Sequence, residues 1–172
     1  MKKIILVGYM GSGKTTVGNA LSQKLNIEFV DLDRFIEEQE DLKIADIFSQ
    51  KGEIYFRKRE NIHFNELLNL DKNLIISLGG GTPCYANNHL HLQDEEVLSF
   101  YLKASIKTLL TRLSLDTSRP LLNGVNDLKS YIGQHLFERS YYYNYSKYII
   151  EINNKSIDYI CSEISTIIYK NI

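Results

Sequence analysis

The chain has 172 residues, a length that suits one globular domain with its own hydrophobic core. Hydrophobic residues make up 44% and charged residues 24%, which excludes a disordered or fibrous protein. The formal net charge of −1 gives no electrostatic reason to expect a nucleic-acid or membrane partner, so any bound anion must be held by a few placed cations.

Targeting and metal signals are weak. The apolar run after "MKK" is too short for a signal peptide, and no run of 18 apolar residues occurs. Cys84 and Cys161 lie far apart, which is typical of structural thiols in a reducing compartment. His89 and His91 lie near Cys84 in an expected polar loop, and we expect no metal site there. These features indicate a cytoplasmic protein.

Apolar runs of strand length alternate with helical patterns. The expected strands are Lys3–Val7, Ile27–Val30, Asn73–Leu78, Val97–Tyr101 and Tyr148–Ile152. The expected helices are Lys14–Leu25, Asp33–Glu40, Ile44–Gln50, Glu53–Leu70, Ile106–Leu113, Asp127–Tyr143 and Ser156–Tyr169. This alternation predicts a three-layer α/β domain, in which helices cover both faces of a parallel sheet. Such folds bind ligands at the carboxyl ends of their strands.

The first expected strand is followed by "GYMGSGKT", which matches G-x-x-x-x-G-K-[ST] with Gly8, Gly13, Lys14 and Thr15 at the fixed positions. Backbone without Cβ atoms can approach phosphates closely, and the N–H groups at the start of the next helix point at the anion. The lysine of such a loop reaches the β- and γ-phosphates, and the threonine hydroxyl binds Mg²⁺. The expected ATP-binding residues here are Gly11, Ser12, Gly13, Lys14, Thr15 and Thr16.

The second expected strand runs into "FVDLD", which places Asp31 and Asp33 two residues apart. Residues two apart in an extended segment face the same side, so both carboxylates can lie beside the phosphates. One of them can order the water shell of the metal while the other accepts a proton from an acceptor hydroxyl. The alternative is that Asp33 only caps the helix that follows it.

The segment "GEIYFRKRENIHF" is expected to be helical. Arg57 follows Glu53 by four residues and precedes Glu60 by three, so two carboxylates can hold its guanidinium. A positioned arginine can bind a substrate carboxylate bidentately, although a surface ion pair of little energetic value is the alternative. The third expected strand then runs into Gly79–Gly81, where a ligand can approach backbone N–H groups directly.

The carboxyl-terminal half supplies further arginines. "TRLSLDTSRPLL" places Arg112 on a helix and Arg119 in the loop of about residues 114–126, whose turn chemistry indicates a mobile lid. "FERSYYYNYSK" contains Arg139 among tyrosines, a mixture that single-stranded nucleic-acid binders also use, but the charge balance disfavours that role. His135 is expected to be a surface or half-buried residue.

The phosphate loop alone does not exclude a GTPase switch. Such a switch carries a D-x-x-G motif, which does not occur in this sequence, and an N-K-x-D base reader. The nearest match, "NKSID", has Ile157 where the aspartate should stand. The sequence therefore favours a kinase over a switch.

Taken in order, "GYMGSGKTTVG", "DLD", "IADIF…KGEIYFRKRE", "SLGGG" and "RPLL" resemble the shikimate kinase family over essentially the whole chain. The resemblance implies a P-loop fold like that of the NMP kinases, with a five-stranded parallel sheet. It also implies phosphorylation of the 3-hydroxyl of shikimate by Mg²⁺-ATP, a step towards chorismate and the aromatic amino acids.

The resemblance assigns roles to individual residues. The residues implied to bind shikimate are Asp33, Arg57, Gly79, Gly80, Gly81 and Arg139. Lys14, Asp33 and Arg119 are implied to be catalytic, with Thr15 on the metal and Asp31 joined to it through water. Arg112 matches the position that packs on adenine, and Arg119 the lid arginine that meets the ATP phosphates.

The resemblance also implies supporting groups. Glu60 matches the acid that supports Arg57, and Tyr143 the tyrosine that follows Arg139 by four residues. Tyr141 and Tyr145 stand where proline and glutamate are usual, a departure that concerns the local support of Arg139.

The whole chain, residues 1–172, is expected to form one domain that acts as a monomer on ATP and shikimate. A related small-molecule kinase, such as a gluconate kinase, is the enzymatic alternative, but it would not need "GEIYFR" together with "SLGGG". A nucleotide-binding module without transfer is the non-enzymatic alternative, and it would not need Asp33.

Overall fold

The computed structural model describes residues 2–114 and 127–171. Within them, five parallel strands form one sheet in the order β2-β3-β1-β4-β5. The strands are β1 (Lys3–Val7), β2 (Phe29–Asp31), β3 (Leu74–Ser77), β4 (Val97–Lys103) and β5 (Tyr148–Glu151). This order confirms the expected α/β fold with a five-stranded parallel sheet.

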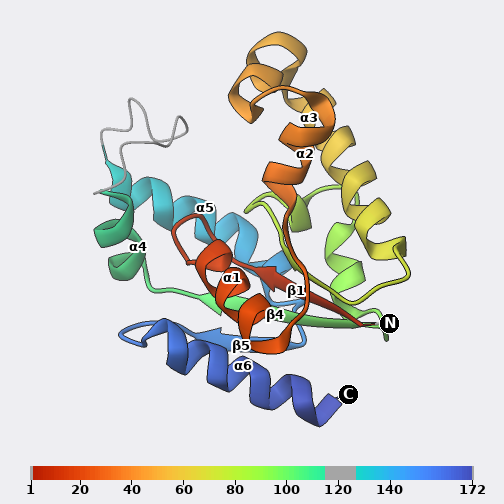
Figure 1. Ribbon diagram of the computed structural model, residues 1–172. Coiled ribbons are helices and arrows are strands. Elements are labelled where there is room, and N and C mark those ends of the chain that lie inside the picture. Colours follow the sequence, from red (N-terminus) through yellow and green to blue (C-terminus); the bar gives the residue numbers. More distant parts are fainter. Residues whose placement is uncertain (1, 115–126, 172) are drawn as a thin grey trace.

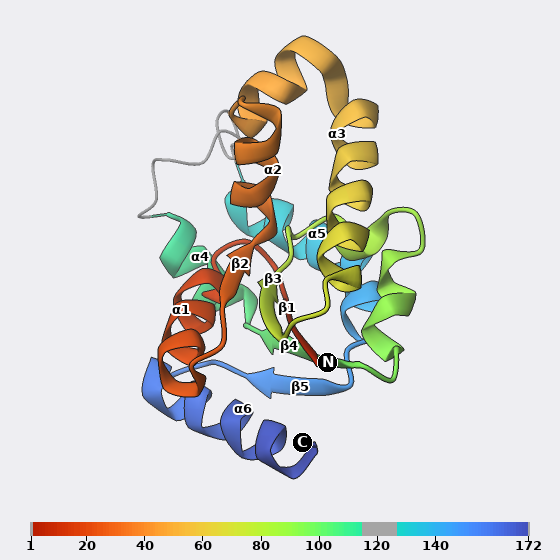
Figure 2. The ribbon, with the colours of Figure 1, turned by 45° about the vertical axis from the view of Figure 1, so that its right-hand side comes forward.

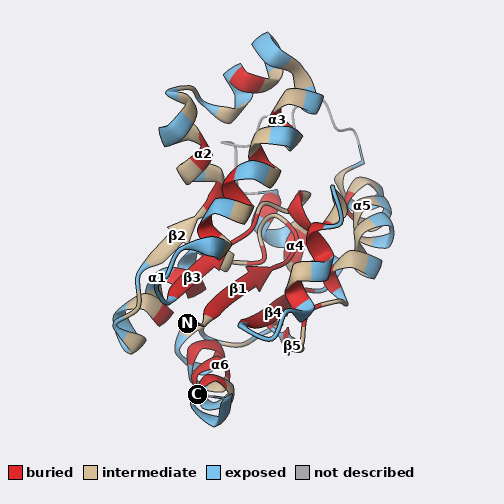
Figure 3. Ribbon diagram, turned by 90° about the vertical axis from the view of Figure 1, so that its right-hand side faces the viewer, coloured by how far each residue is buried: buried red, intermediate tan, exposed pale blue. Residues whose placement is uncertain are grey.

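The middle of the sheet is apolar on both faces. Every residue of β1 and β3 is buried (Figure 3), as expected for runs that are apolar except for the first residue of "KIILV" and the last of "LIIS". In β1, Ile4 pairs with Ile75 of β3 and Leu98 of β4. The register of the three central strands brings their carboxyl ends to one edge of the sheet.

Helices cover both faces of the sheet (Figure 1). They include α1 (Lys14–Leu25), α4 (Ile106–Leu113), α5 (Leu128–Tyr143) and α6 (Ile157–Asn171). On one face α1 packs against α6, where Cys161 lies within 3.9 Å of the carbonyl of Val17. On the other face α5 places Tyr143 against Tyr101 of β4, with 5.2 Å between ring centroids. No helix in residues 2–114 or 127–171 is both long and apolar enough to span a bilayer.

Two helices, α2 (Leu32–Glu40) and α3 (Ile44–Asn69), project together from the sheet (Figures 1 and 2). The hydrogen bonds of α3 continue through Gly52, but φ of 81° and ψ of 168° there produce a kink. Glycine tolerates this conformation because it has no Cβ atom. The kink divides α3 at the boundary between the two helices that the sequence predicts.

Two short 3₁₀ helices, η1 (Thr82–Cys84) and η2 (Asn88–Gln93), occupy the segment that was expected to be a polar loop. The side chain of His89 in η2 is buried rather than solvated. Its ring lies 5.1 Å from that of Tyr142 and 4.6 Å from that of Tyr145, measured between centroids. The expectation of a polar loop is wrong here, because Tyr142 of α5 and Tyr145 just beyond that helix provide an aromatic surface for the ring.

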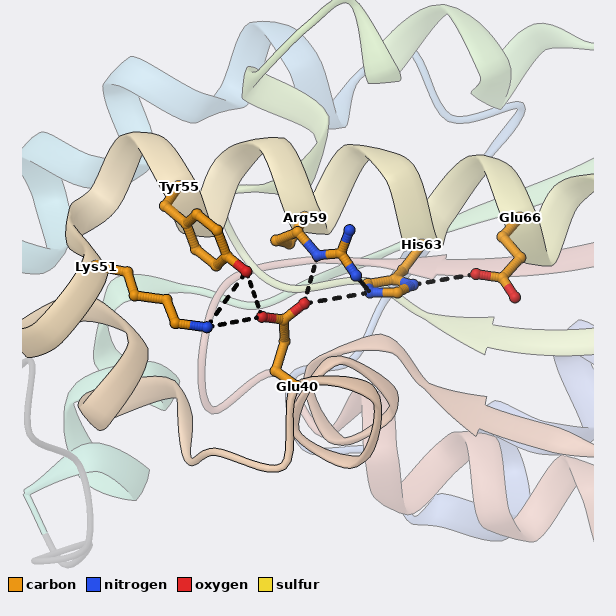
Figure 4. A network of polar contacts seen from close by, with 6 residues as sticks. All are labelled: Glu40, Lys51, Tyr55, Arg59, His63 and Glu66. Carbon is orange, nitrogen blue, oxygen red and sulfur yellow. Dashed lines mark hydrogen bonds and ion pairs between the residues drawn. The ribbon is translucent and has the colours of Figure 1, made fainter.

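A buried carboxylate joins α2 to α3 (Figure 4). Glu40, at the end of α2, accepts hydrogen bonds from the hydroxyl of Tyr55 at 2.6 Å, from the guanidinium of Arg59, and from the ammonium of Lys51 at 3.3 Å. Only 5% of its side chain is exposed. These bonds, that of Tyr55 above all, lower the pKa of Glu40 to about 2. The ionised carboxylate therefore stabilises the helix pair.

We expect Glu40→Gln to lower the free energy of unfolding at pH 7 by about 2 to 4 kcal/mol, because the cations facing it lose their buried partner. The pKa of Glu40 is about 2 when folded, below its ordinary value of 4.5. The stabilisation is therefore complete above the ordinary value and disappears as the pH falls towards 2. Denaturant titrations at pH 7 and pH 3 measure this effect.

The matched control is Glu38→Gln, which removes an exposed ion pair with Arg34 on the same helix. It should change the free energy of unfolding by less than about 1 kcal/mol. Equal unfolding energies for Glu40→Gln and the parent at pH 7 would show that Glu40 does not stabilise the helix pair.

Candidate active site

A cavity of about 400 Å³ opens at the carboxyl ends of β1, β2 and β3. Its lining residues come from the loop after β1, the end of β2, the start of α2 and the turn after β3, with Arg112 of α4 and Ile157 of α6 beside them. The volume is typical of a site for a small molecule or nucleotide. Segments far apart in the sequence thus meet at the edge where ligands bind in open parallel sheets.

The loop between β1 and α1 is shaped for an anion. Gly13 caps α1 with φ of 91°, a left-handed conformation that suits glycine, and it has no side chain to occupy the first N–H groups of the helix. The ammonium of Lys14 lies over the loop and donates to the carbonyls of Gly8 at 2.8 Å and Tyr9 at 3.2 Å. N–H groups and a lysine around one hollow fit a phosphate group.

Most of the expected ATP-binding residues surround the cavity. Gly11, Gly13, Lys14, Thr15, Thr16 and Arg112 line it. Ser12 does not: it is 2% exposed, and its N–H donates to the carbonyl of Tyr9 at 3.1 Å. Arg112 donates from Nη1 to the carbonyl of Gly11 at 2.9 Å, so it is held beside the loop. The expected lid of about residues 114–126, with Arg119 in it, lies outside the described residues apart from Ser114.

Two oxygen-bearing side chains meet next to the loop. The hydroxyl of Thr15 donates to Oδ2 of Asp31 at 2.8 Å, and both residues line the cavity. Carboxylate and hydroxyl oxygens are the ligands that Mg²⁺ prefers. The arrangement suits a magnesium ion that is bound together with a phosphate group.

The helix cap differs from the expected one. Asp31, not Asp33, caps α2, since its side chain accepts a bond from the N–H of Arg34 at 3.4 Å. The expectation that Asp31 and Asp33 lie in one extended segment is also wrong, because the strand ends at Asp31 and Asp33 lies in the first helical turn. Both carboxylates nevertheless line the same cavity.

Asp33 has the electrostatic environment of a base. Burial raises the pKa of Asp33 to about 6, and the negative charges of Glu60 and Asp31 act in the same direction. Lys14 and Arg57 oppose this shift. A carboxylate with a raised pKa that is still ionised at pH 7 accepts a proton more readily than an ordinary aspartate.

Arg57 is a fixed, largely buried arginine. Its Nη1 donates to Oε2 of Glu60 at 2.7 Å, while Oε1 of Glu60 accepts the hydroxyl of Thr82 at 2.6 Å. Glu60 is 1% exposed and the side chain of Arg57 19% exposed. Glu53 adds a longer bond to Nε of Arg57 at 3.5 Å. The alternative of a surface ion pair is therefore wrong.

The glycine turn after β3 leaves room for charged side chains. A Cβ atom on Gly79 would lie 2.8 Å from Oδ1 of Asp33, and one on Gly81 would lie 2.7 Å from Nη2 of Arg57. Gly80 lies beside Arg139, and a Cβ atom added to Gly80 would lie 3.4 Å from Nη1 of Arg139. Larger residues in this turn would displace these side chains. The turn thus brings two arginines and an aspartate close together, and of these three the aspartate lines the cavity.

Arg139 is supported differently from the expected pattern. Its guanidinium lies over the ring of Tyr9, 5.7 Å from the centroid. Tyr143 donates its hydroxyl to the carbonyl of Gly80 at 2.6 Å. The two departing tyrosines, Tyr141 and Tyr145, share a hydroxyl hydrogen bond of 3.0 Å beside the ring of His89. The aromatic ring on which Arg139 packs is therefore that of Tyr9, a residue of the phosphate loop.

Some residues around the cavity had not been predicted. Met10, Ser77, Leu78 and Ile157 also line it, and Thr82 bonds to Glu60 behind it. Thr82 directly follows the glycines, so its position in the sequence could have identified it as a residue near the site. Met10 lies within the phosphate loop, and Ser77 and Leu78 begin the motif "SLGGG", so their motifs also placed them. Ile157 has an ordinary helix side chain, and only the fold brings it here.

Comparisons with known proteins agree that the chain is similar to shikimate kinases. A sequence model described as shikimate kinase matches residues 10–169. The shikimate kinase of Flavobacterium johnsoniae is 50% identical, covering 98% of this chain and 99% of that protein, and that of Flavobacterium psychrophilum is 48% identical, covering 98% and 100%. The structure of shikimate kinase from Acinetobacter baumannii in complex with shikimate has a TM-score of 0.90 and 35% identity, covering 99% of this chain and 94% of that one.

Proposed function

This chain belongs to the shikimate kinase family, and on that premise we propose that it transfers the γ-phosphoryl group of ATP to the 3-hydroxyl of shikimate. The products are shikimate 3-phosphate and ADP. The observation that carries the proposal is the meeting of Asp33, Arg57 and Arg139 around Gly79–Gly81, beside the phosphate loop. Membership of this family sets aside the gluconate kinase and the nucleotide-binding switch.

The acceptor side needs groups for one carboxylate and several hydroxyls. We assign the carboxylate to the guanidinium groups of Arg57 and Arg139, since a planar fork binds it bidentately. The ion pair with the buried Glu60 holds Arg57 in one orientation. Asp33 and the backbone of Gly79–Gly81 complete the acceptor site.

The nucleotide side uses the phosphate loop. We assign the phosphates to Gly11, Ser12, Gly13, Lys14, Thr15 and Thr16, and the adenine ring to Arg112. Arg119, outside the described residues, remains a prediction for the phosphates.

The family generally uses Mg²⁺ with ATP, and the residues present fit this ion. The hydroxyl of Thr15 and the carboxylate of Asp31, 2.8 Å apart, offer the oxygen ligands it prefers. We propose that Thr15 binds the ion and that Asp31 holds it through water. When bound, the ion neutralises charge on the phosphates.

The transfer step needs little covalent chemistry from the protein. Asp33 accepts the proton of the 3-hydroxyl, the hydroxyl oxygen forms a bond to the γ-phosphorus, and the bond from that phosphorus to the ADP oxygen breaks. Lys14 stabilises the negative charge that the phosphoryl oxygens carry. Positioning and charge stabilisation supply most of the rate enhancement in such reactions.

We expect Arg57→Lys to raise the KM for shikimate about 10- to 100-fold, because lysine keeps the charge but loses the planar fork. The dissociation constant of ATP, measured without shikimate, should remain within about twofold of the parent value. Arg34→Lys, an exposed arginine on α2 paired only with Glu38 in the described residues, is the control. If Arg57→Lys weakened ATP and spared shikimate, the acceptor site would be misplaced.

Product analysis tests the proposed reaction itself. The protein is incubated with ATP, Mg²⁺ and shikimate, and phosphorus NMR then identifies the phosphorylated position. We expect a single phosphate ester at the 3-hydroxyl. An ester at another hydroxyl, or free inorganic phosphate as the main product, would contradict the proposal.

A further inference from the structure

Four side chains lie on one face of α5, and the last three of them contact the phosphate loop or the glycine turn. Spaced by four residues, they are Tyr131, His135, Arg139 and Tyr143. The rings of the first two lie against each other at an interplanar angle of 51°, with 4.1 Å between centroids. The third lies over Tyr9, and the fourth donates to the carbonyl of Gly80. Packing at the protein surface does not by itself explain why His135 lies in this row.

Tyr9 connects this row to the phosphate loop. It is 1% exposed, and its carbonyl accepts bonds from the N–H of Ser12 at 3.1 Å and the ammonium of Lys14 at 3.2 Å. Its ring lies under the guanidinium of Arg139, 5.7 Å from centroid to carbon. Its hydroxyl lies 3.1 Å from Nδ1 of His135. One residue therefore joins the nucleotide loop, the acceptor arginine and the histidine.

The bond between Tyr9 and His135 joins two neutral groups at pH 7. Burial raises the pKa of Tyr9 to about 12, so the phenol keeps its proton. Burial, and then the charge of Arg139, lowers the pKa of His135, so the imidazole is neutral. The tautomer of His135 decides which of the two donates, and the bond joins the same atoms in either case. The ring of Tyr131 covers the imidazole and limits its rotation.

Arg139 is held by neutral groups, the hydroxyl of Tyr143 and the ring of Tyr9. Within residues 2–114 and 127–171, no carboxylate forms an ion pair with it, whereas Arg57 has Glu60. A guanidinium is attracted to the face of an aromatic ring at this distance, but the ring must keep its orientation. The hydrogen bond between the Tyr9 hydroxyl and His135 fixes the orientation of the ring. The ring in turn fixes the orientation of the guanidinium plane of Arg139.

We propose that His135 is a positioning residue for Arg139, acting through its hydrogen bond to Tyr9 and thereby strengthening the binding of the acceptor carboxylate. The inference rests on the proposed function, which assigns Arg139 to the carboxylate of shikimate. It adds a residue from outside the cavity lining, and it makes Tyr9 a structural link between the two substrate sites.

The test compares Tyr9→Phe, His135→Leu and the double variant by steady-state kinetics. Each single change should raise the KM for shikimate about 3- to 10-fold, since each removes the same hydrogen bond, while the KM for ATP stays within about twofold. The double variant should match the single variants, because the two changes are not additive within one interaction. His135→Asn, whose amide lies near the place of Nδ1, should restore the parent KM.

Two controls separate positioning from general damage. Tyr148→Phe removes a hydroxyl bond to Asn171, far from the acceptor site, and should leave both KM values unchanged. The methyl ester of shikimate lacks the carboxylate charge, so the parent and Tyr9→Phe should use it with equal kcat/KM. A purely structural effect would lower kcat/KM for shikimate and its ester alike.

The outcomes are distinct. Parental KM values for shikimate in both single variants, additive increases in the double variant, or an equal loss with the ester would overturn the inference and leave the proposed function standing. A parent protein that does not phosphorylate shikimate would overturn the proposed function, and the inference with it.

Discussion

Lys14→Ala is expected to lower kcat for shikimate phosphorylation by about 10²- to 10³-fold or more, while the protein stays folded. The ammonium lies over the phosphate loop and bonds to the carbonyls of Gly8 and Tyr9. Its contribution is electrostatic, because it opens a helix beside an anion site and is not part of the apolar core. Thermal unfolding without ligand should therefore change by only a few degrees.

The matched control is Lys24→Ala at the other end of the same helix, where the ammonium bonds only to Ser162 among the described residues. This variant should keep the parent kcat. A Lys14→Ala protein that turned over shikimate at nearly the parent rate would show that the loop is not the ATP phosphate site.

Asp33→Asn is expected to lower kcat about 10²- to 10⁴-fold and to leave the dissociation constant of ATP nearly unchanged. The amide keeps the shape of the side chain but cannot accept the hydroxyl proton. Because Asp31 is the cap of α2, the loss cannot be attributed to helix capping. Asp46→Asn, an exposed change near the start of α3, should keep the parent kcat.

The same residue predicts two pH effects. The pKa of Asp33, raised from 3.8 to about 6, means that kcat/KM for shikimate should fall as the pH drops through about 6. A raised carboxyl pKa also means that the folded state loses stability as the pH rises through that value. Asp33→Asn should therefore unfold at a higher temperature than the parent at pH 7, and the difference should shrink towards pH 4.

Normal turnover in Asp33→Asn would show that Asp33 is not the base. An unchanged melting temperature at pH 7 would instead show that its carboxylate is not destabilised by burial. The two measurements thus test the chemical role and the electrostatic environment of Asp33 separately.

The sequence predicted those parts of the site whose chemistry is local. The phosphate loop depends on a fixed spacing of Gly13, Lys14 and Thr15, and the structure gives them the expected arrangement. The helical spacing of Arg57 and Glu60 likewise predicted their ion pair. In both cases the interacting groups are a few residues apart, so secondary structure alone brings them together.

Contacts between distant segments were not predictable in this way. The capping role went to Asp31 because α2 begins at Leu32, one residue earlier than the expected helix, directly after the last residue of β2 that pairs with β3. The bond between His135 and Tyr9 spans 126 positions, and no spacing rule connects them. The steric reason for the glycine turn also required the positions of Asp33 and Arg57 in the fold.

The most direct test of the function measures ADP release with Mg²⁺-ATP and each of four acceptors in turn: shikimate, quinate, gluconate and a nucleoside monophosphate. We predict fast ADP release with shikimate, far slower release with gluconate or the nucleotide, and little release without any acceptor. The release with shikimate should disappear in Lys14→Ala. Release that is as fast with gluconate or the nucleotide as with shikimate, or that does not depend on an acceptor, would contradict the assignment of this site to shikimate.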